Sequence, residues 1–426
     1  MVDSSSIVPQ AFEDESVLHA SWPDRDDHDN AGKTSTSITR VVARSITIAR
    51  SLTVFWDEGL GGACQDYPYV WLRDHCRCPK CFHAGFQTRL SEFKDFDIDI
   101  DIKDAVIGDD GRSLSIWWSD DHRSQYSSKW LFCNRFDQSE GEPVRSIEPE
   151  LWEAESMRMR TFNYSDIVES DKNLYDMLVQ LKTVGVAVIS GTPPEKGHVS
   201  KLSERIGYLT VTSYGTTSNI YGKQEWAFGH PSYGLEYRPL HTDYSFCQDP
   251  PGIFLLHCID QVKGNGGEYF FVDGFKAALD LKQLDPDAFD RLTVPCWESR
   301  VKGWVVNDRH YHYSRHAPIT LNQDRSLAKI ICCDFWKTSV MRLPVGEVDA
   351  TYRAMKSFHN LMYEEKRACR HILRPGDVLI FDNSRILHGR EAYRDTAPSQ
   401  VHLETCYFGW DSVDSRLRKL KMTLAK

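Results

Sequence analysis

Two metal-capable side chains, His241 and Asp243, stand two residues apart near the middle of this 426-residue chain. If the segment is a β-strand, its side chains alternate between two faces, so the imidazole and the carboxylate point into one cavity. Two imidazoles and one carboxylate form the facial triad that holds non-haem Fe(II) and leaves coordination positions open. A chain that uses this pair to bind iron must therefore fold so that a distant His reaches it.

The best candidate for that third ligand is His388. It follows the apolar stretch 378–383, which reads as a buried strand, and it precedes Gly389, where the backbone is free to turn. Two ligands on one strand and one on a distant strand would meet at one mouth of a barrel. A histidine that caps a turn is the alternative for His388. His257 competes as a ligand, but its apolar strand is more typical of a buried core histidine.

A second candidate metal site is marked by three of the twelve cysteines, which fall within six residues: Cys76, Cys78 and Cys81. Thiolates this close repel one another unless a cation holds them, and four N/S ligands in a tetrahedron form a structural zinc site. We expect His122, on a polar turn, to be the fourth ligand; His75 and His83 are local alternatives. Buried thiols without a metal are the other interpretation. The remaining cysteines are scattered, which favours free thiols over a disulfide framework.

Composition excludes several classes of protein. The net charge of −10 argues against a nucleic-acid binder. No apolar run approaches the roughly 20 residues of a membrane span. Residues 1–37 are polar and acidic and lack the apolar segment of a secretory signal, so we expect a disordered acidic tail and, by default, a cytoplasmic protein.

Short β-branched segments dominate the rest of the chain. Segments 38–55, 69–72 and 97–102 read as strands of a small β-rich domain over residues 38–140. Residues 151–426 contain further strands and a few helices, one of them marked by apolar residues at helical spacing from Leu174 to Leu181. This pattern predicts a mainly β fold with flanking helices, in which the larger domain is a jelly-roll barrel.

Seven motifs in combination resemble the gamma-butyrobetaine dioxygenase and trimethyllysine dioxygenase family, from about residue 40 to Leu420. They are Val70–Cys81, Trp118–His122, His241–Tyr244, Pro250–Gly252, Leu255–Cys258, Val272–Phe275 and Phe381–Arg390. The resemblance implies a double-stranded β-helix oxygenase domain, a zinc-binding N-terminal domain and a homodimer. It also implies that Fe(II), 2-oxoglutarate and O2 serve to oxidise an unactivated C–H bond of a small amine-bearing substrate. By the same resemblance, His241, Asp243 and His388 hold iron, and Cys76, Cys78, Cys81 and His122 hold zinc.

One departure from the family concerns the co-substrate. The family places an Arg directly before a His-Leu pair, where it clamps the distal carboxylate of 2-oxoglutarate. Here Val401 precedes His402 and offers no donor. Arg390, Arg394 or His402 could take over this role, although Arg390 could equally be a structural residue of its turn. Altered or absent use of 2-oxoglutarate is the alternative.

A second departure concerns the substrate. Tyr214, Tyr233 and Tyr407 match the aromatic positions with which the family encloses a quaternary ammonium group, where ring faces attract a cation. Ser218 stands where the butyrobetaine enzymes carry a Trp. The substrate therefore need not be trimethylated: we expect a betaine or a smaller amino acid, or a precursor in secondary metabolism that undergoes desaturation or cyclisation. Tyr residues of a core or rim, and a non-catalytic binding protein on the same fold, are the remaining alternatives.

Overall fold

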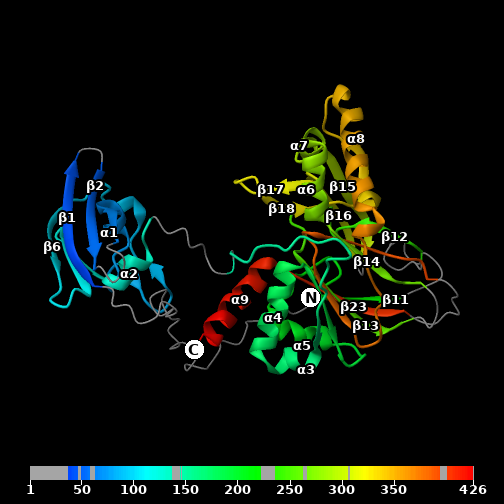
Figure 1. Ribbon diagram of the computed structural model, residues 1–426, viewed down its shortest axis with the longest axis horizontal. Coiled ribbons are helices and arrows are strands. Elements are labelled where there is room, and N and C mark those ends of the chain that lie inside the picture. Colours follow the sequence, from blue (N-terminus) through cyan, green and yellow to red (C-terminus); the bar gives the residue numbers. More distant parts are fainter. Residues whose placement is uncertain are drawn as a thin grey trace, which may run out of the picture. The chain divides into compact units, whose positions relative to one another are not determined.

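The computed structural model describes residues 37–46, 49–57, 63–136, 144, 146–221, 236–261, 266–305, 308–393 and 401–425. The chain divides into two compact units, Met1–Gly141 and Glu142–Lys426 (Figure 1). The acidic segment 1–36 lies outside the described residues.

Antiparallel sheets build the N-terminal unit. Among its described residues the sheets have the strand orders β1-β2-β3, β6-β7-β8 and β4-β5. The strands are β1 Ile38–Ile46, β2 Ala49–Trp56, β3 Cys64–Pro68, β4 Phe82–His83, β5 Thr88–Arg89, β6 Ile102–Ile107, β7 Ser113–Trp118 and β8 Arg123–Ser127; the helices are α1 Tyr69–Asp74 and α2 Ser128–Cys133. Large aromatic side chains, including Trp118 and Tyr126, fill the core between them.

Two segments of this unit differ from their predicted form. Residues 69–72 were expected to be a strand and are the first turn of α1. Tyr69 and Leu72 are both buried, which a helix achieves because residues three apart share a face. The alternating segment 97–102 was also expected to be a strand, but strand β6 begins only at Ile102. The Asp97 side chain accepts a hydrogen bond from the Asp99 amide at 2.8 Å, and this local turn competes with a sheet ladder.

Two sheets form the centre of the C-terminal unit. Their strand orders are β11-β23-β13-β21-β10-β9 and β12-β22-β14-β20. The strands are β9 Thr161–Asn163, β10 Val186–Ser190, β11 Thr217–Tyr221, β12 Arg238–His241, β13 Ile253–Asp260, β14 Tyr269–Asp273, β20 Cys369–His371, β21 Val378–Asp382, β22 Ile386–Arg390 and β23 His402–Phe408. The pairing is antiparallel except between β9 and β10.

Side chains from the facing sides of these two sheets pack into one apolar layer, here called the interior cluster. Its members include Phe254, Phe271, Phe381, Ile386, Tyr269, Tyr393, Val401 and Tyr407. Strand β13 is buried on both faces, which explains why its sequence reads as a continuous apolar run.

Helices cover the outer face of each sheet (Figure 1). Helices α4, α5 and α9 pack on the six-stranded sheet through residues such as Leu178, Leu202 and Leu417. Helices α6, α7 and α8 pack on the four-stranded sheet through residues such as Leu281 and Phe358. The helices are α3 Tyr164–Glu169, α4 Asp171–Thr183, α5 His198–Ile206, α6 Gly274–Leu284, α7 Pro286–Leu292, α8 Val345–Met362 and α9 Trp410–Leu424.

Further strands extend the unit beyond its two central sheets. They are β15 Trp297–Val305, β16 Asp308–His316, β17 Ile319–Leu321, β18 Leu327–Ile330 and β19 Lys337–Met341. The prediction of a mainly β protein with flanking helices is confirmed. In the described part of the chain, every helix is too short or too polar to cross a membrane.

Candidate metal centres

The first centre lies where β12 and β22 pair in the four-stranded sheet. His241, the last residue of β12, stands directly opposite His388 of β22. The centroids of the two imidazole rings are 4.2 Å apart. Opposed residues of an antiparallel pair point to the same face, and His388 is also opposite Phe271, a member of the interior cluster. Both imidazoles therefore face the interior between the sheets.

Asp243 reaches the same point from a turn. Strand β12 ends at His241, and residues 243–246 form a turn in which Tyr244 adopts a φ of 60°. The buried Asn383 holds this turn: its Oδ1 accepts from the Asp243 amide at 2.7 Å, and its Nδ2 donates to the Asp243 carbonyl at 3.2 Å. The prediction that strand alternation aligns the two ligands was wrong, because this turn brings the carboxylate to the imidazoles.

The three side chains present their ligand atoms to one another. Asp243 Oδ1 lies 3.4 Å from His241 Nε2, and Asp243 Oδ2 lies 3.9 Å from His388 Nε2. One ligand atom from each of the three residues lies within 4.8 Å of the others. His241 Nδ1 is 2.9 Å from the Pro239 carbonyl, to which it can donate only in the tautomer that leaves Nε2 free for a cation. The Tyr407 hydroxyl donates to Asp243 Oδ2 at 2.9 Å.

The pKa shifts of the same residues favour the protonation states that bind a cation. Burial disfavours the charged carboxylate of Asp243, but the adjacent imidazoles of His241 and His388 and the Tyr407 hydroxyl outweigh burial and hold the pKa of Asp243 well below the usual range. Burial and the nearby His241 lower the pKa of His388 to about 3. An anionic carboxylate beside a neutral imidazole is the protonation state in which such residues bind a metal, so the donor set fits Fe(II).

The residues expected at the co-substrate fall on different faces. Arg390 is buried on β22, two residues after His388, and so shares its face. His402 lies on the opposite face of β23 from Tyr407; its Nε2 is 2.9 Å from Asn219 Oδ1 and its ring stacks on Tyr221. Val401 is buried in the interior cluster, and Arg394 lies outside the described residues.

The residues expected at the substrate also lie in different places. Tyr407 is in the interior, where its ring stacks on Phe254 with centroids 4.8 Å apart. Tyr214 is half-buried against the interior cluster. The Ser218 hydroxyl is bonded to Thr405 across the β11–β23 pair at 2.6 Å. Tyr233 lies outside the described residues.

Two residues of this centre were missed from the sequence. Asn383 lies within a recognised motif, Phe381–Arg390, but its two-way clamp on the Asp243 backbone depends on a contact between distant segments. Arg238 stands directly opposite Arg390 on β12. No local signal marks it, because it lies three residues before His241 and an unbroken strand would place these two on opposite faces.

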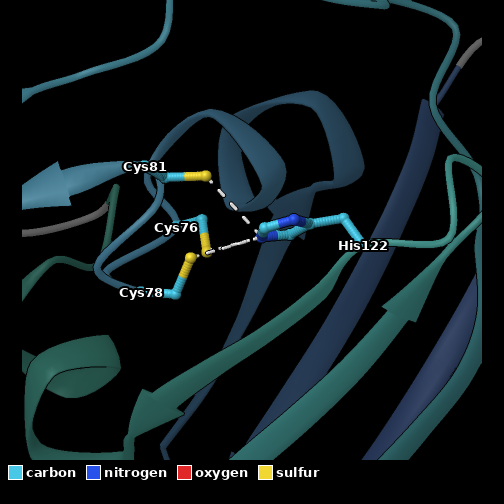
Figure 2. A group of neighbouring side chains, drawn as sticks. All are labelled: Cys76, Cys78, Cys81 and His122. Carbon is cyan, nitrogen blue, oxygen red and sulfur yellow. Dashed lines mark hydrogen bonds between the residues drawn. The ribbon is translucent and has the colours of Figure 1, made fainter.

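The second centre lies in the N-terminal unit, where three thiols surround one imidazole (Figure 2). Cys76 follows helix α1, and Cys78 and Cys81 lie in the next turn, closed by the Cys81 amide on the Cys78 carbonyl at 2.9 Å. His122 comes from the turn between β7 and β8. Its backbone is fixed by a hydrogen bond from its amide to Asp120 Oδ1 at 3.0 Å.

The spacing within this centre suits a tetrahedral metal. His122 Nε2 is 3.2 Å from the Cys76 sulfur and 3.6 Å from those of Cys78 and Cys81. Zinc bonds of ordinary length at tetrahedral angles separate a sulfur and a nitrogen ligand by about 3.5 Å. The alternatives lie elsewhere: His75 stacks on Trp71, and His83 Nδ1 accepts from the Phe86 amide.

Comparison with known proteins matches both units. Residues 143–407 match the family model of the taurine catabolism dioxygenase TauD, TfdA family, and residues 46–132 match the gamma-butyrobetaine hydroxylase-like N-terminal model. Human gamma-butyrobetaine dioxygenase is 33% identical over 359 residues, which cover 83% of this chain and 91% of that protein. Human mitochondrial trimethyllysine dioxygenase is 29% identical over 389 residues, covering 88% and 89%. The gamma-butyrobetaine dioxygenase of Pseudomonas sp. (strain AK-1) is 27% identical over 384 residues, covering 89% and 96%.

Proposed function

We propose a substrate class and a set of residue roles from one premise: the chain belongs to the taurine catabolism dioxygenase TauD, TfdA family. It also has relatives at about 30% identity that are named gamma-butyrobetaine and trimethyllysine dioxygenases, so the family expected from the sequence motifs is confirmed. The protein is accordingly an Fe(II)/2-oxoglutarate-dependent dioxygenase, and the alternative of a non-catalytic binding protein is set aside.

In our proposal, His241, Asp243 and His388 hold the Fe(II). The observation that carries this assignment is the convergence of these three ligand groups, from two buried histidines and the half-buried Asp243. Bound iron, with 2-oxoglutarate and O2, supplies the oxidising power for an unactivated C–H bond. Three protein ligands leave the other coordination positions for small molecules.

The surrounding residues orient the ligands and keep water away. The Pro239 carbonyl fixes the tautomer of His241, and the Tyr407 hydroxyl fixes one oxygen of Asp243. Phe254 and Phe381 pack against the ring of His388, with ring centroids 6.0 and 4.7 Å away. Apolar rings beside a reactive centre limit side reactions with water.

The substrate we propose is a small amine-bearing molecule, either a betaine or an amino acid. Two relatives are named for trimethylated amines, and Tyr214 and Tyr407 are aromatic residues in or against the interior cluster. The Tyr407 hydroxyl is engaged by Asp243 and one face of its ring stacks on Phe254, so Tyr407 could offer a cation only the remaining part of its ring. Desaturation or cyclisation in secondary metabolism is the second candidate, favoured by Val401 and Ser218, which depart from the family pattern.

We assign the oxygenase domain to residues 151–426, with the double-stranded β-helix formed by the two central sheets, and a structural zinc domain to residues 38–140. Zinc would be held by Cys76, Cys78, Cys81 and His122. A fully ligated zinc has no position for substrate, so this site would stabilise its unit. The cysteines of the described residues form no disulfide, which is compatible with a cytoplasmic enzyme. The homodimer follows from the family resemblance, and sedimentation would test it.

The experiment that tests the function is a screen of betaines and amino acids for substrate-dependent release of succinate. The purified protein is supplied with Fe(II), 2-oxoglutarate and air. At least one amine-bearing compound should raise succinate release stoichiometrically with an oxidised product, and Asp243→Ala should abolish both. A desaturated or cyclised product would favour the second candidate, and release of succinate with none of the compounds would contradict the first.

A further inference from the structure

Two arginines form the pair next to the two imidazoles on the same two strands. Arg238 of β12 and Arg390 of β22 are directly opposite each other, as are His241 and His388. A register shift in β12 falls between the two pairs and brings Arg238 onto the same face as His241. Both guanidinium groups are therefore on the face of the sheet that carries the iron ligands.

The surroundings of this pair are aromatic and apolar. Arg390 is 6% exposed, stands opposite Tyr269 on β14, and has its guanidinium carbon 4.7 Å from the ring centroid of Tyr393. One Arg390 nitrogen, Nη2, donates to the Glu236 backbone carbonyl at 3.2 Å. Arg238 Nη2 is buried and has no hydrogen-bond partner among the described residues.

The two arginines are like charges on neighbouring strands, so they repel one another. Burial and the neighbouring Arg390 outweigh the opposing charge of Glu236 and lower the pKa of Arg238 to about 10, which still leaves it protonated at neutral pH. Desolvating two cations side by side is costly unless an anion joins them. A carboxylate can accept two parallel hydrogen bonds from a guanidinium group, and a second guanidinium can share its remaining lone pairs.

We propose that Arg238 and Arg390 together bind the distal carboxylate of 2-oxoglutarate. This inference rests on the proposed iron site, because the other end of the co-substrate must be at the metal. Arg390 lies two residues beyond His388, and two residues of strand span about 7 Å. A five-carbon dicarboxylate that contacts the metal through its keto acid end extends over a distance of this order.

The pair also accounts for Val401. By the family resemblance, the cation for this carboxylate belongs at position 401, directly before β23, and this chain has an apolar side chain there. Val401 is buried in the interior cluster together with Tyr269 and Tyr393, the two rings that flank Arg390. In this chain, Arg238 of β12 would supply the positive charge that the family places at position 401.

The test compares two keto acids on the zinc-containing, full-length protein loaded anaerobically with Fe(II). 2-Oxoglutarate and 2-oxopentanoate share the keto acid end and chain length, but the second lacks the distal carboxylate. Dissociation constants come from titration of the charge-transfer band and from calorimetry. The wild type should prefer 2-oxoglutarate by about 30-fold or more, as expected for a buried charge-assisted contact.

Arg238→Leu should remove that preference. Its dissociation constant for 2-oxoglutarate should rise about 30-fold, while that for 2-oxopentanoate should change by less than about threefold. Arg238→Lys keeps the charge but loses the planar fork, and should fall between Arg238→Leu and the wild type. The double variant Arg238→Leu/Val401→Arg should recover at least about tenfold of the lost affinity.

Arg370→Leu is the matched control. Arg370 lies on β20 of the same sheet and pairs with Glu268 and Glu391 at 3.1 and 3.0 Å, so its loss should leave the preference unchanged. An unchanged preference in both Arg238→Leu and Arg238→Lys would overturn the clamp. If Arg238→Leu does not fold, the preference of Arg238→Lys for 2-oxoglutarate is used alone: a weaker preference supports the clamp, and an unchanged preference overturns it. Absence of iron binding or of any charge-transfer band in the wild type would instead overturn the proposed function.

Discussion

The two candidate metal centres are built on opposite principles. In the N-terminal unit, Cys76, Cys78 and Cys81 come from one short loop, and four N/S groups leave no position free. In the C-terminal unit, His241 and Asp243 are joined by His388 from a segment far along the chain, and these three groups leave positions open. The first arrangement suits a cation that stabilises a small unit, and the second suits a cation that binds small molecules. In our proposal, the cysteine loop with His122 would serve stability, while the reactive centre would depend on the pairing of β12 with β22.

The largest expected effect concerns the centre of Cys76, Cys78, Cys81 and His122, here called the closed centre; the centre of His241, Asp243 and His388 is called the open centre. Cys76→Ser should abolish zinc binding and the cooperative unfolding of the N-terminal unit, because structural zinc contributes on the order of 10 kcal/mol of apparent binding free energy in small domains. Metal content and calorimetric unfolding measure both effects. His83→Ala is the control: it changes a histidine near the same loop that does not face the thiols. Full retention of zinc by Cys76→Ser would contradict the assignment.

A change at the open centre should impair iron binding and activity but leave zinc binding intact. His388→Ala should lower iron affinity and succinate release by more than about 100-fold, since residues that only support a metal ligand already contribute 10- to 100-fold. Zinc content should remain at the wild-type level, because the closed centre has separate ligands. Iron titration and succinate assay provide the readouts. Undiminished iron binding would remove His388 from the site.

Asn383 is distant in the chain from Asp243 but holds its turn by hydrogen bonds, and a substitution of Asn383 tests this support of the open centre. Its side chain makes hydrogen bonds with the amide and carbonyl of Asp243 and with the Pro251 carbonyl. Asn383→Ala should lower the free energy of unfolding of the C-terminal unit by about 2–4 kcal/mol and weaken iron binding, because buried polar groups lose their partners. Denaturant titration measures the first effect. Asn322→Ala, at an exposed turn, should change neither value, and an equal response of both variants would contradict the role of Asn383.

The smallest effect is expected at the hydroxyl of Tyr407. Tyr407→Phe removes the hydrogen bond to Asp243 Oδ2 and keeps the ring, so iron affinity should fall by about tenfold while unfolding changes little. Tyr164→Phe provides the comparison, since the Tyr164 hydroxyl bonds to His198 beyond the six-stranded sheet. Equal iron affinity in Tyr407→Phe and the wild type would show that this hydroxyl does not orient the ligand.

Residue chemistry made the members of both centres predictable, but not their geometry. His122 was expected at the thiols and is brought there by the β7–β8 turn. Asp243 was expected on the strand of His241, whereas it lies on a turn. That turn requires a left-handed Tyr244 and the distant Asn383, and neither has a local signature in the sequence.

The same limit applies to the fold. The apolar spacing from Leu174 to Leu181 predicted a helix, and α4 is present because Ser170 caps it and one face is buried. Residues 69–72 have strand-forming side chains, but packing of Tyr69 and Leu72 on one side overrides that preference. The position of Arg238 could not be predicted, because a register shift in β12 that has no sequence signature places it on the same face as His241.

The most direct measurement is the visible spectrum of the protein after anaerobic addition of Fe(II) and 2-oxoglutarate. Binding of both at the centre formed by His241, Asp243 and His388 should produce a metal-to-ligand charge-transfer band in the wild type and no band in His388→Ala. Admission of air with an amine-bearing substrate should then discharge the band and release succinate. A wild-type protein that gives neither the band nor succinate would contradict the account.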